Sequence, residues 1–459
     1  MRRRGQGLLA LVLVALALVG ASAAARLGPA SPTSGGEPTV RSGEWLCPHG
    51  GGEGWTAEVV VTNPGDRPVQ ARVSALGPDA KPEEPVTLTV AAGAQLRREV
   101  PAAGPDSATY VEVFGGWASA SWLLRAAEPD VGLGAEACAP AGAQRWLTTE
   151  STTQEGEHAF LVVMNPYASG AVFDVTLHQP DEPPLRDPDW SDIELRAGRA
   201  TALRLDAKVV GKDTVAAIVD VRAGRVAVAT LGVTEGGGVR SVLGATAEAD
   251  TWATGTAWGT GQARILVLVP GENAVRFGAV LRSSRAPQTA GGLVDVRQTS
   301  LSTQAYPVIA DGPSSIEVQT ADGALVVAAL RADGQSDDDA ATAGASRAST
   351  AWIVPPTVGD EPAFSDLILA NPGEAPIDAT LTLLGVDGPG ATRTVTVPAG
   401  GTATVDEDFR EADPRASVLV LGEGPLFATA AATSGGVRGL SLYALASGTP
   451  IPAWAVPSD

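Results

Sequence analysis

The sequence has few of the residues from which metal sites and acid–base catalytic sites are built. Its 459 residues include two cysteines and three histidines. Two distant cysteines and scattered histidines lack the ligand spacing of a zinc site. The pattern Gly-x-Ser-x-Gly of many serine hydrolases does not occur, and His49, His158 and His178 lie at unrelated points of the chain. We therefore predict no metal, no cofactor and no catalytic residues.

Basic residues are also scarce. Lysine and arginine together number 32 against 52 acidic residues, which gives a formal net charge of −20. Such a field repels a phosphate backbone, so nucleic acid is not an expected partner. Helical periodicity is scarce after the first 26 residues. The chain therefore lacks the strand-turn-helix setting that a phosphate-binding glycine loop needs.

Long apolar runs are confined to the N-terminus. Three arginines at positions 2–4 precede a run of apolar and small residues over 8–25. This order is typical of a secretory signal peptide, and the alternative is a retained membrane anchor. Both interpretations predict an exported protein of the cell envelope or the extracellular space. We expect a signal peptide or anchor over residues 1–26 and a flexible stalk, rich in Pro, Ser and Gly, over residues 27–43.

The two cysteines agree with export. Cys47 and Cys138 are the only ones in the chain. In an oxidising compartment an isolated pair most simply forms one disulfide. The alternative is a pair of buried free thiols.

Half of the ten tryptophans recur at one period. Trp45, Trp146, Trp252, Trp352 and Trp454 are separated by 101, 106, 100 and 102 residues. Such a period indicates repeated structural units. We predict four modules, over residues 44–144, 145–250, 251–350 and 351–459. A fifth tryptophan strand, over residues 452–457, is expected to close the exposed edge of the last module.

A second marker follows each of the first four tryptophans by about eighteen to twenty residues, where a strand pattern ends at proline. The strand ends are Asn63-Pro64, Asn165-Pro166, Val269-Pro270 with Asn273 close by, and Asn371-Pro372. Proline cannot continue a β-ladder, and asparagine can accept a hydrogen bond from the backbone that follows it. We interpret these residues as structural strand stops.

Between these markers, apolar residues alternate with threonine, as at residues 86–90 and 380–383. Alternation indicates strands with one buried face. An Ala-Gly turn ends at Gly93, Gly198 and Gly400, but the third module lacks it. Later glycine turns suggest hairpins at 115–116, 224, 322–323 and 422–424.

About seven short strands per module predict an all-β fold of four tandem immunoglobulin-like β-sandwich modules. A β-propeller is the alternative architecture. The linkers are short, so we expect the modules to form a semi-rigid array.

Two sets of side chains are candidates for ligand binding. Asp187, Asp189 and Asp192 share one acidic loop, and their oxygens suit calcium. Trp117 and Trp190 are candidates for stacking on sugar rings, although most tryptophans pack in cores.

The segment Trp45-Leu46-Cys47-Pro48, the Asn-Pro strand ends and the basic apolar N-terminus support a resemblance. Over most of residues 44–459, the chain resembles an uncharacterised family of exported actinobacterial proteins known only as a domain of unknown function. The resemblance implies an envelope or extracellular location and brings no catalytic residues. The modules also look like bacterial immunoglobulin-like repeats that serve as stalks and adhesive spacers.

These observations predict a non-enzymatic extracellular scaffold or partner-binding protein of the cell envelope. Its partner would be an unknown envelope protein or a glycan. The alternatives are a carbohydrate-binding or calcium-dependent surface adhesion protein and, in third place, an accessory subunit of an enzyme.

Overall fold

The computed structural model describes part of the chain. The described residues are 43–78, 84–126, 132–235, 238–256, 262–310, 312–333, 339–357, 364–405, 409, 412–433 and 442–457. The chain divides into Met1–Val40 and Arg41–Asp459, and the description below concerns the second unit. The predicted signal peptide or anchor, and the predicted stalk up to residue 42, lie outside the described residues. Within the described part, no helix has the length and apolar character needed to cross a membrane.

Antiparallel strands make up most of the described chain, as the alternating pattern predicts. The first module has β1 (Gly43–Cys47), β2 (Thr56–Asn63), β3 (Val69–Leu76), β4 (Val86–Val90), β5 (Ala94–Pro101), β6 (Ala108–Phe114), β7 (Ser119–Arg125) and β8 (Leu133–Ala137). The second has β9 (Arg145–Thr148), β10 (Glu157–Asn165), β11 (Ala171–Gln179), β12 (Glu182–Arg186), the 3-10 helix η1 (Pro188–Trp190), β13 (Ile193–Leu195), β14 (Arg199–Arg204), β15 (Ala216–Ala223), β16 (Ala227–Thr234) and β17 (Val239–Leu243).

The later modules repeat this order. The third has β18 (Thr251–Thr256), β19 (Gln262–Val269), β20 (Val275–Arg282), β21 (Gln288–Thr289), η2 (Ala290–Gly292), β22 (Val296–Gln298), β23 (Ser302–Ile309), β24 (Ser314–Thr320), η3 (Ala321–Gly323), β25 (Val327–Asp333) and β26 (Asp339–Ala343). The fourth has β27 (Ser349–Val354), β28 (Phe364–Ala370), β29 (Ile377–Gly385), β30 (Gly388–Val397), β31 (Thr402–Val405), β32 (Ser417–Thr433), β33 (Leu442–Ser447) and β34 (Thr449–Pro450).

Each module is a pair of antiparallel sheets. In the first, the sheets have the orders β1-β6-β3-β4 and β5-β2-β7-β8. The second and third modules repeat this arrangement, with the strand equivalent to β4 split in two by η1 or η2. In the fourth, the long strand β32 belongs to both sheets. The result is an all-β chain of repeated, sandwich-like sheet pairs.

Burial follows the alternation that the sequence shows. Along β3 and β29, buried residues alternate with exposed or half-buried ones over most of the strand, which gives each sheet one buried face. By contrast, β7 and β16 are buried along almost their whole length, because neighbouring modules cover their second face. The apolar side chains gather in four large clusters, each centred on one module with members from adjacent modules.

The glycine turns that were expected to close hairpins instead carry the chain from one sheet to the other. β6 and β7 flank Gly115, yet they pair with strands of opposite sheets. Gly115 has a φ of 93°, a conformation that glycine adopts without steric cost. In the fourth module no separate turn exists, because Gly422–Gly424 lie inside β32. The hairpin prediction was wrong because two short strands joined by glycine give the same local pattern in either arrangement.

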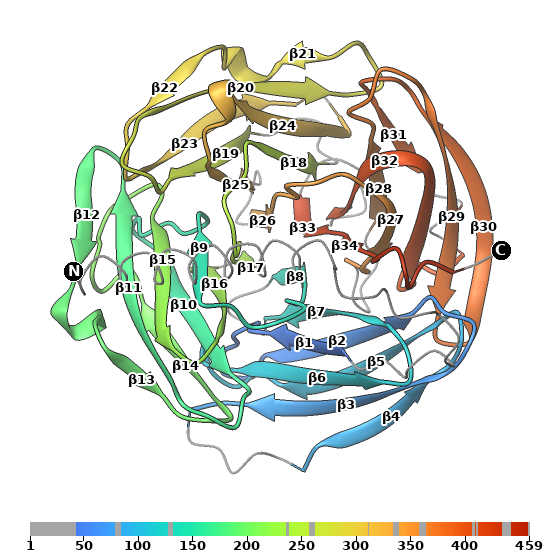
Figure 1. Cartoon of the computed structure of the whole chain (residues 1–459), viewed down its shortest axis with the longest axis horizontal. Coiled ribbons are helices and arrows are strands. Elements are labelled where there is room, and N and C mark those ends of the chain that lie inside the picture. Colours follow the sequence, from blue (N-terminus) through green and yellow to red (C-terminus); the bar gives the residue numbers. More distant parts are fainter. Residues whose placement is uncertain are drawn as a thin grey trace, which may run out of the picture. The chain divides into compact units, whose positions relative to one another are not determined.

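The four modules follow one another around a common centre (Figure 1). The innermost strands are β8, β17, β26 and β33, and each packs against two of the others. The prediction of a semi-rigid array left the arrangement of the modules open, and the modules of Arg41–Asp459 form one compact unit. Tandem copies that repeat the same head-to-tail interface close into a ring when their rotation permits it.

The interface between consecutive modules recurs at equivalent positions. The segment after the left-handed turn of one module lies against the preceding module. Ala200 N–H donates to the Gly77 carbonyl at 3.2 Å, and Thr402 N–H donates to the Ser283 carbonyl at 3.1 Å. The backbone thus ties the second module to the first and the fourth to the third.

The segment after the left-handed turn of the first module, which begins at Gly93, contacts the fourth module and so closes the ring. Gln95 Nε2 donates to the Arg415 carbonyl at 2.7 Å, and its Oε1 accepts from Ser417 N–H at 2.9 Å. The hydroxyls of Thr62 and Ser417 lie 2.7 Å apart. These contacts join residues more than 300 positions apart in the chain.

Candidate functional site

The first four repeated tryptophans occupy equivalent sockets. All four side chains are at most 5% exposed. Each indole N–H donates to a backbone carbonyl that lies directly before β7, β16 or β25 or, in the fourth module, within β32. The pairs are Trp45–Ala118 at 2.6 Å, Trp146–Val226 at 2.8 Å, Trp252–Val326 at 2.8 Å and Trp352–Leu426 at 2.9 Å. A buried indole needs such a partner, so the repeat marks a structural socket.

Trp454 does not occupy a fifth socket. It is 52% exposed, and residues 452–457 form a turn instead of the predicted closing strand. The free edge of β27 is covered by β34, which pairs Thr449 with Ile353. Equivalent bridges in the other modules are Leu46–Ala139, Leu147–Ala245 and Ala253–Ala345. The edge is therefore covered as expected, but by residues several positions before the tryptophan.

The asparagines at the strand ends are buried and bonded. Asn165 Nδ2 donates to the carbonyls of Ser169, Leu195 and Arg196 at 2.8, 3.2 and 3.3 Å, while its Oδ1 accepts from Tyr167 N–H at 3.1 Å. Asn63 and Asn371 make the same kinds of bond. Each side chain therefore ties the end of one strand to the end of a strand in the opposite sheet. Pro64, Pro166 and Pro372 follow directly, where the strands end.

The third module reaches the same geometry with different residues. Gln298 Nε2 donates to the Val267 carbonyl at 2.9 Å, so the amide comes from the opposite strand end. Asn273, by contrast, is exposed on the turn. Leu301 has a φ of 53°, close to the 65° of Gly198, and so takes the place of the missing Ala-Gly turn. Its carbonyl lies 2.9 Å from His178 Nδ1 of the second module.

Cys47 and Cys138 form a disulfide. Both cysteines are buried. The bond joins the end of β1 to the residue that follows β8, beside the Leu46–Ala139 bridge. It therefore fixes the first tryptophan strand to the innermost strand of its own module.

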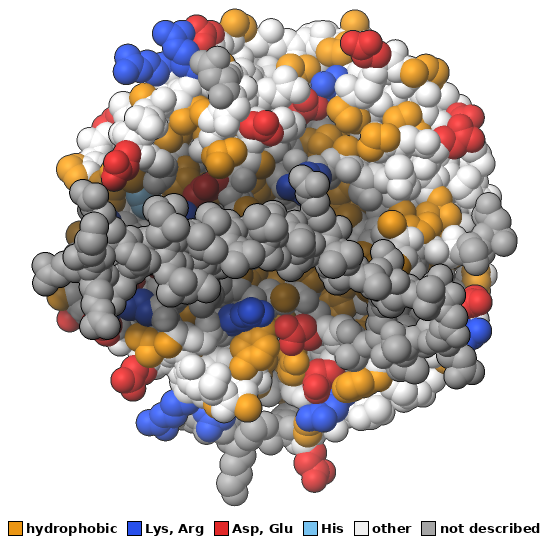
Figure 2. All heavy atoms as spheres, viewed as in Figure 1, with side chains coloured by type: hydrophobic (Ala, Val, Ile, Leu, Met, Phe, Trp, Pro, Cys, Tyr) orange, Lys and Arg blue, Asp and Glu red, His pale blue; other side chains and the backbone are white. Residues whose placement is uncertain are grey.

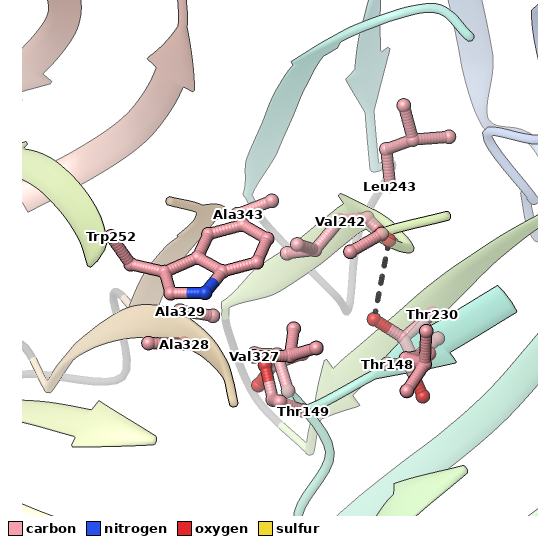
Figure 3. Close-up of a pocket in the computed structure, with 13 residues that line it drawn as sticks. Thr148, Thr149, Thr230, Val242, Leu243, Trp252, Val327, Ala328, Ala329 and Ala343 are labelled. Carbon is pink, nitrogen blue, oxygen red and sulfur yellow. Dashed lines mark hydrogen bonds between the residues drawn. The ribbon is translucent and has the colours of Figure 1, made fainter. Parts of the chain in front are cut away.

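A small chamber lies between the second and third modules (Figure 3). Its volume of about 10 Å³ is close to the least that can hold one water molecule. Thr148, Thr149 and Thr230 line it on one side and the Trp252 indole on the other. The Thr230 hydroxyl donates to the Val242 carbonyl at 3.4 Å. The chamber has no room for an organic substrate.

A larger and more polar cleft, of about 170 Å³, lies where the fourth module meets the first. Glu58, Glu99, Arg125 and Arg415 surround a floor that includes Leu123. The Glu58 carboxylate is engaged, because Arg97 Nε donates to its Oε1 at 2.6 Å. The cleft thus combines charges of both signs over an apolar floor and sits on the contact that closes the ring.

The acidic loop of the second module is neutralised by its own cations. Lys208 Nζ lies 2.7 Å from Asp187 and 3.1 Å from Asp189. Arg222 lies 2.5 Å from Asp192. The pKa of Asp187 is held below its usual range by the hydrogen bond from Lys208. In the described ranges, no group of three or more His, Cys, Asp or Glu side chains is placed to hold a metal ion.

The two tryptophans considered for sugar stacking lie in different environments. Trp190 is 6% exposed, with Lys208 Nζ 5.8 Å from its ring centroid, so it presents no open face. Trp117 is half-buried and packs edge-on against Trp45 with centroids 6.0 Å apart. It also contacts the apolar cluster that contains Ile353 and thus belongs to the contact between the first and fourth modules.

The three histidines have different contact partners, and two of them are buried. His49 Nδ1 lies 2.7 Å from the Gly50 carbonyl, and Nε2 lies 3.0 Å from the Thr109 hydroxyl. Burial lowers the pKa of His49 to about 4, so the ring is neutral at pH 7. His158 is partly exposed and lies 3.6 Å from both Asp206 and Glu235. None of these contacts includes a serine or cysteine nucleophile.

The charge on the visible face is dispersed. Figure 2 shows both acidic and basic side chains scattered around its periphery, with apolar groups between them. The net charge of −20 is therefore not gathered into one patch on this face.

Comparison with protein families gives a match. A family model described as a family of unknown function, DUF5719, matches residues 115–408. No curated protein matches the chain. The matched residues begin just before β7 of the first module, cover the second and third modules and reach the end of β31 in the fourth, which is more than half of the sequence. The chain therefore belongs to the family of unknown function DUF5719.

Proposed function

We propose that this protein is a non-enzymatic scaffold or partner-binding protein of the cell envelope, exported through its N-terminal segment. The observation that carries the proposal is the use of the repeated residues. The tryptophans fill sockets and the asparagines tie strand ends, so the repetition serves architecture. A protein whose repeated elements hold a rigid body together is suited to present surfaces to other molecules.

Export is supported by two features. The basic and apolar N-terminal pattern is typical of a signal peptide or anchor. The disulfide between Cys47 and Cys138 suits an oxidising compartment, since disulfides are rare in the cytosol. The proposed location is the envelope or the extracellular space, and residues 8–25 would act as a cleaved signal or as an anchor.

The immunoglobulin-like assignment of the modules is part of the proposal. It is supported by two strand pairs, β2–β5 and β3–β6, which correspond to the B–E and C–F pairs of immunoglobulin domains. The first, fourth and seventh strands differ: β1 pairs with β6, β4 with β3 and β7 with β2. The modules would thus be a variant in which these three strands lie in the other sheet.

Ring closure changes the kind of scaffold that is proposed. A linear array of sandwiches extends a binding site away from a membrane, whereas a closed ring does not gain length with each module. We therefore favour a platform that binds an envelope protein or a glycan on its surface. The charged cleft between the fourth and first modules is the place where we would first look for such contacts.

Cell fractionation with protease treatment tests the proposal. In intact cells, added protease should digest the protein while a cytoplasmic marker survives, and mass spectrometry should identify the mature N-terminus. Cross-linking in the same cells should then capture an envelope protein or a glycan. Recovery of the protein in the cytoplasm with Cys47 and Cys138 reduced would contradict the proposal.

Calcium-dependent or carbohydrate-dependent adhesion is the other candidate. The geometry does not support a calcium site in the acidic loop. Its three carboxylates are already paired with Lys208 or Arg222. Binding to a glycan array that is lost in Trp117→Ala, with unchanged thermal stability, would favour the carbohydrate version.

A further inference from the structure

One carboxyl group lies at the centre of the ring, where three modules meet. Glu136 is on β8, the innermost strand of the first module, and is 2% exposed. At the equivalent positions, the second, third and fourth modules have Val242, Thr342 and Ala446, which are apolar or small. A buried carboxyl group in this place needs hydrogen-bond partners.

Those partners come from across the centre. Thr342 Oγ1 of the third module lies 3.0 Å from Glu136 Oε2, and Ala343 N–H donates to the same oxygen at 3.3 Å. The other oxygen, Oε1, accepts from Ala137 N–H at 3.0 Å. The fourth module joins through Ser447, whose hydroxyl lies 3.2 Å from Thr342 Oγ1 and donates to the Ala343 carbonyl at 2.7 Å.

The Thr342 hydroxyl can serve both protonation states of Glu136. When the carboxyl is ionised, the hydroxyl donates to Glu136 Oε2. When the carboxyl is protonated, it donates its own proton to Thr342 Oγ1, and the hydroxyl turns to the Ala343 carbonyl, 3.2 Å away. Hydroxyl protons rotate in this way to suit their partners. The hydrogen bond between Thr342 and Glu136 can therefore form in both protonation states, which differ in the charge that is buried.

The described contacts of Glu136 are one hydroxyl and backbone N–H groups. None of these contacts is a cation that would compensate the charge of the ionised carboxylate. The charged groups on the strands packed against β8 lie elsewhere in the fold. Arg240 on β17 is bound to Glu150 and Glu157, and Arg125 on β7 lines the outer cleft. A buried carboxylate without a cation destabilises the contact that holds it.

The geometry points to a pH-dependent contact at the centre of the ring: protonation of Glu136 tightens the junction of the first, third and fourth modules, and ionisation loosens it. Burial supports the same direction, since it raises the pKa of Glu136 to about 7. The folded-state pKa lies above the usual value of 4.5. The stabilising effect is therefore fully present below pH 4.5 and is lost as the pH rises through about 7.

Amide hydrogen exchange of the intact chain, measured by mass spectrometry between pH 5 and 8.5, tests this inference. After correction for intrinsic exchange, the opening of β8, β26 and β33 should increase by roughly tenfold for each pH unit up to about 7 in the wild type. Glu136→Gln, which keeps the shape and removes the titration, should remove this dependence. Glu194→Gln, at an exposed carboxyl on β13, is the matched control and should behave as the wild type.

Two results would overturn the inference. One is the same pH dependence in the wild type and Glu136→Gln. The other is an opening that decreases as the pH rises. If Glu136→Gln does not fold, Thr342→Val provides a second test. Loss of the hydroxyl donor should move the midpoint of the wild-type transition to higher pH, and an unchanged midpoint would contradict the inference.

Discussion

The indole N–H of Trp146 donates to the carbonyl of Val226, 2.8 Å away and 80 residues later in the chain. Replacement of Trp146 by Phe would remove this donor, so that the Val226 carbonyl keeps only the Ala143 N–H, and would open a cavity. We expect a loss of about 3 kcal/mol in the free energy of unfolding, measured in urea. Trp454→Phe, at the exposed tryptophan, should change it by less than about 0.5 kcal/mol. Equal losses in the two variants would show that the sockets are not the structural sites described here.

The buried asparagines should be more sensitive than their exposed counterpart. Asn165→Ala removes one acceptor and the donor to three carbonyls. We expect a destabilisation of about 2 to 3 kcal/mol by thermal or urea unfolding. Asn273→Ala, at the exposed turn of the third module, should be nearly neutral. A neutral Asn165→Ala would contradict the proposed role of the amide.

The left-handed turns offer a reciprocal pair of substitutions. Gly198 has a φ of 65° and open space around an added Cβ, so Gly198→Leu tests backbone strain with little steric clash at Cβ. We expect a cost of about 1 kcal/mol. Leu301→Gly should relieve the same backbone strain, but glycine also gives the unfolded chain more entropy. The net result should be an unchanged free energy of unfolding or a gain of about 0.5 kcal/mol. Clear destabilisation by Leu301→Gly would show that the Leu301 side chain contributes more than its backbone strain costs.

His49 should make the protein less stable in acid. Its folded-state pKa of about 4 lies below the usual 6.5, because burial disfavours the charged ring. The stability that the neutral ring contributes is present above pH 6.5 and is lost as the pH falls toward 4. Urea unfolding at pH 7 and pH 4 should show a loss in the wild type, of about 3 kcal/mol, that is absent in His49→Gln. Acid has the opposite effect through Glu136, whose protonation stabilises the fold. The test is therefore the difference in pH dependence between the wild type and His49→Gln. An identical pH dependence in both would contradict the assignment.

Much of the architecture could be predicted because it repeats. The period of the tryptophans located the four sockets, and the chemistry of Asn before Pro indicated a strand stop that the hydrogen bonds of Asn63, Asn165 and Asn371 explain. The alternation of apolar residues and threonine predicted strands with one buried face. These features depend on neighbours in the chain or on the period itself.

Features that depend on distant partners could not be predicted in this way. Ring closure rests on Gln95 and Ser417, which carry no periodic signal. The glycine turns look alike whether the chain pairs within one sheet or crosses to the other. Glu136 did leave a signal: its equivalents in the other three inner strands, Val242, Thr342 and Ala446, are uncharged. A comparison of the modules residue by residue would have singled it out.

Small-angle X-ray scattering of residues 41–459 tests the central claim most directly, because closure of the ring determines the size of the particle. A single compact unit of this length should have a radius of gyration of about 22 Å. Four separate modules of about 100 residues in a line would give roughly 40 Å. We predict a radius of gyration near 22 Å. Added cross-links between the first and fourth modules should reduce it little or not at all. A value near 40 Å would contradict the ring.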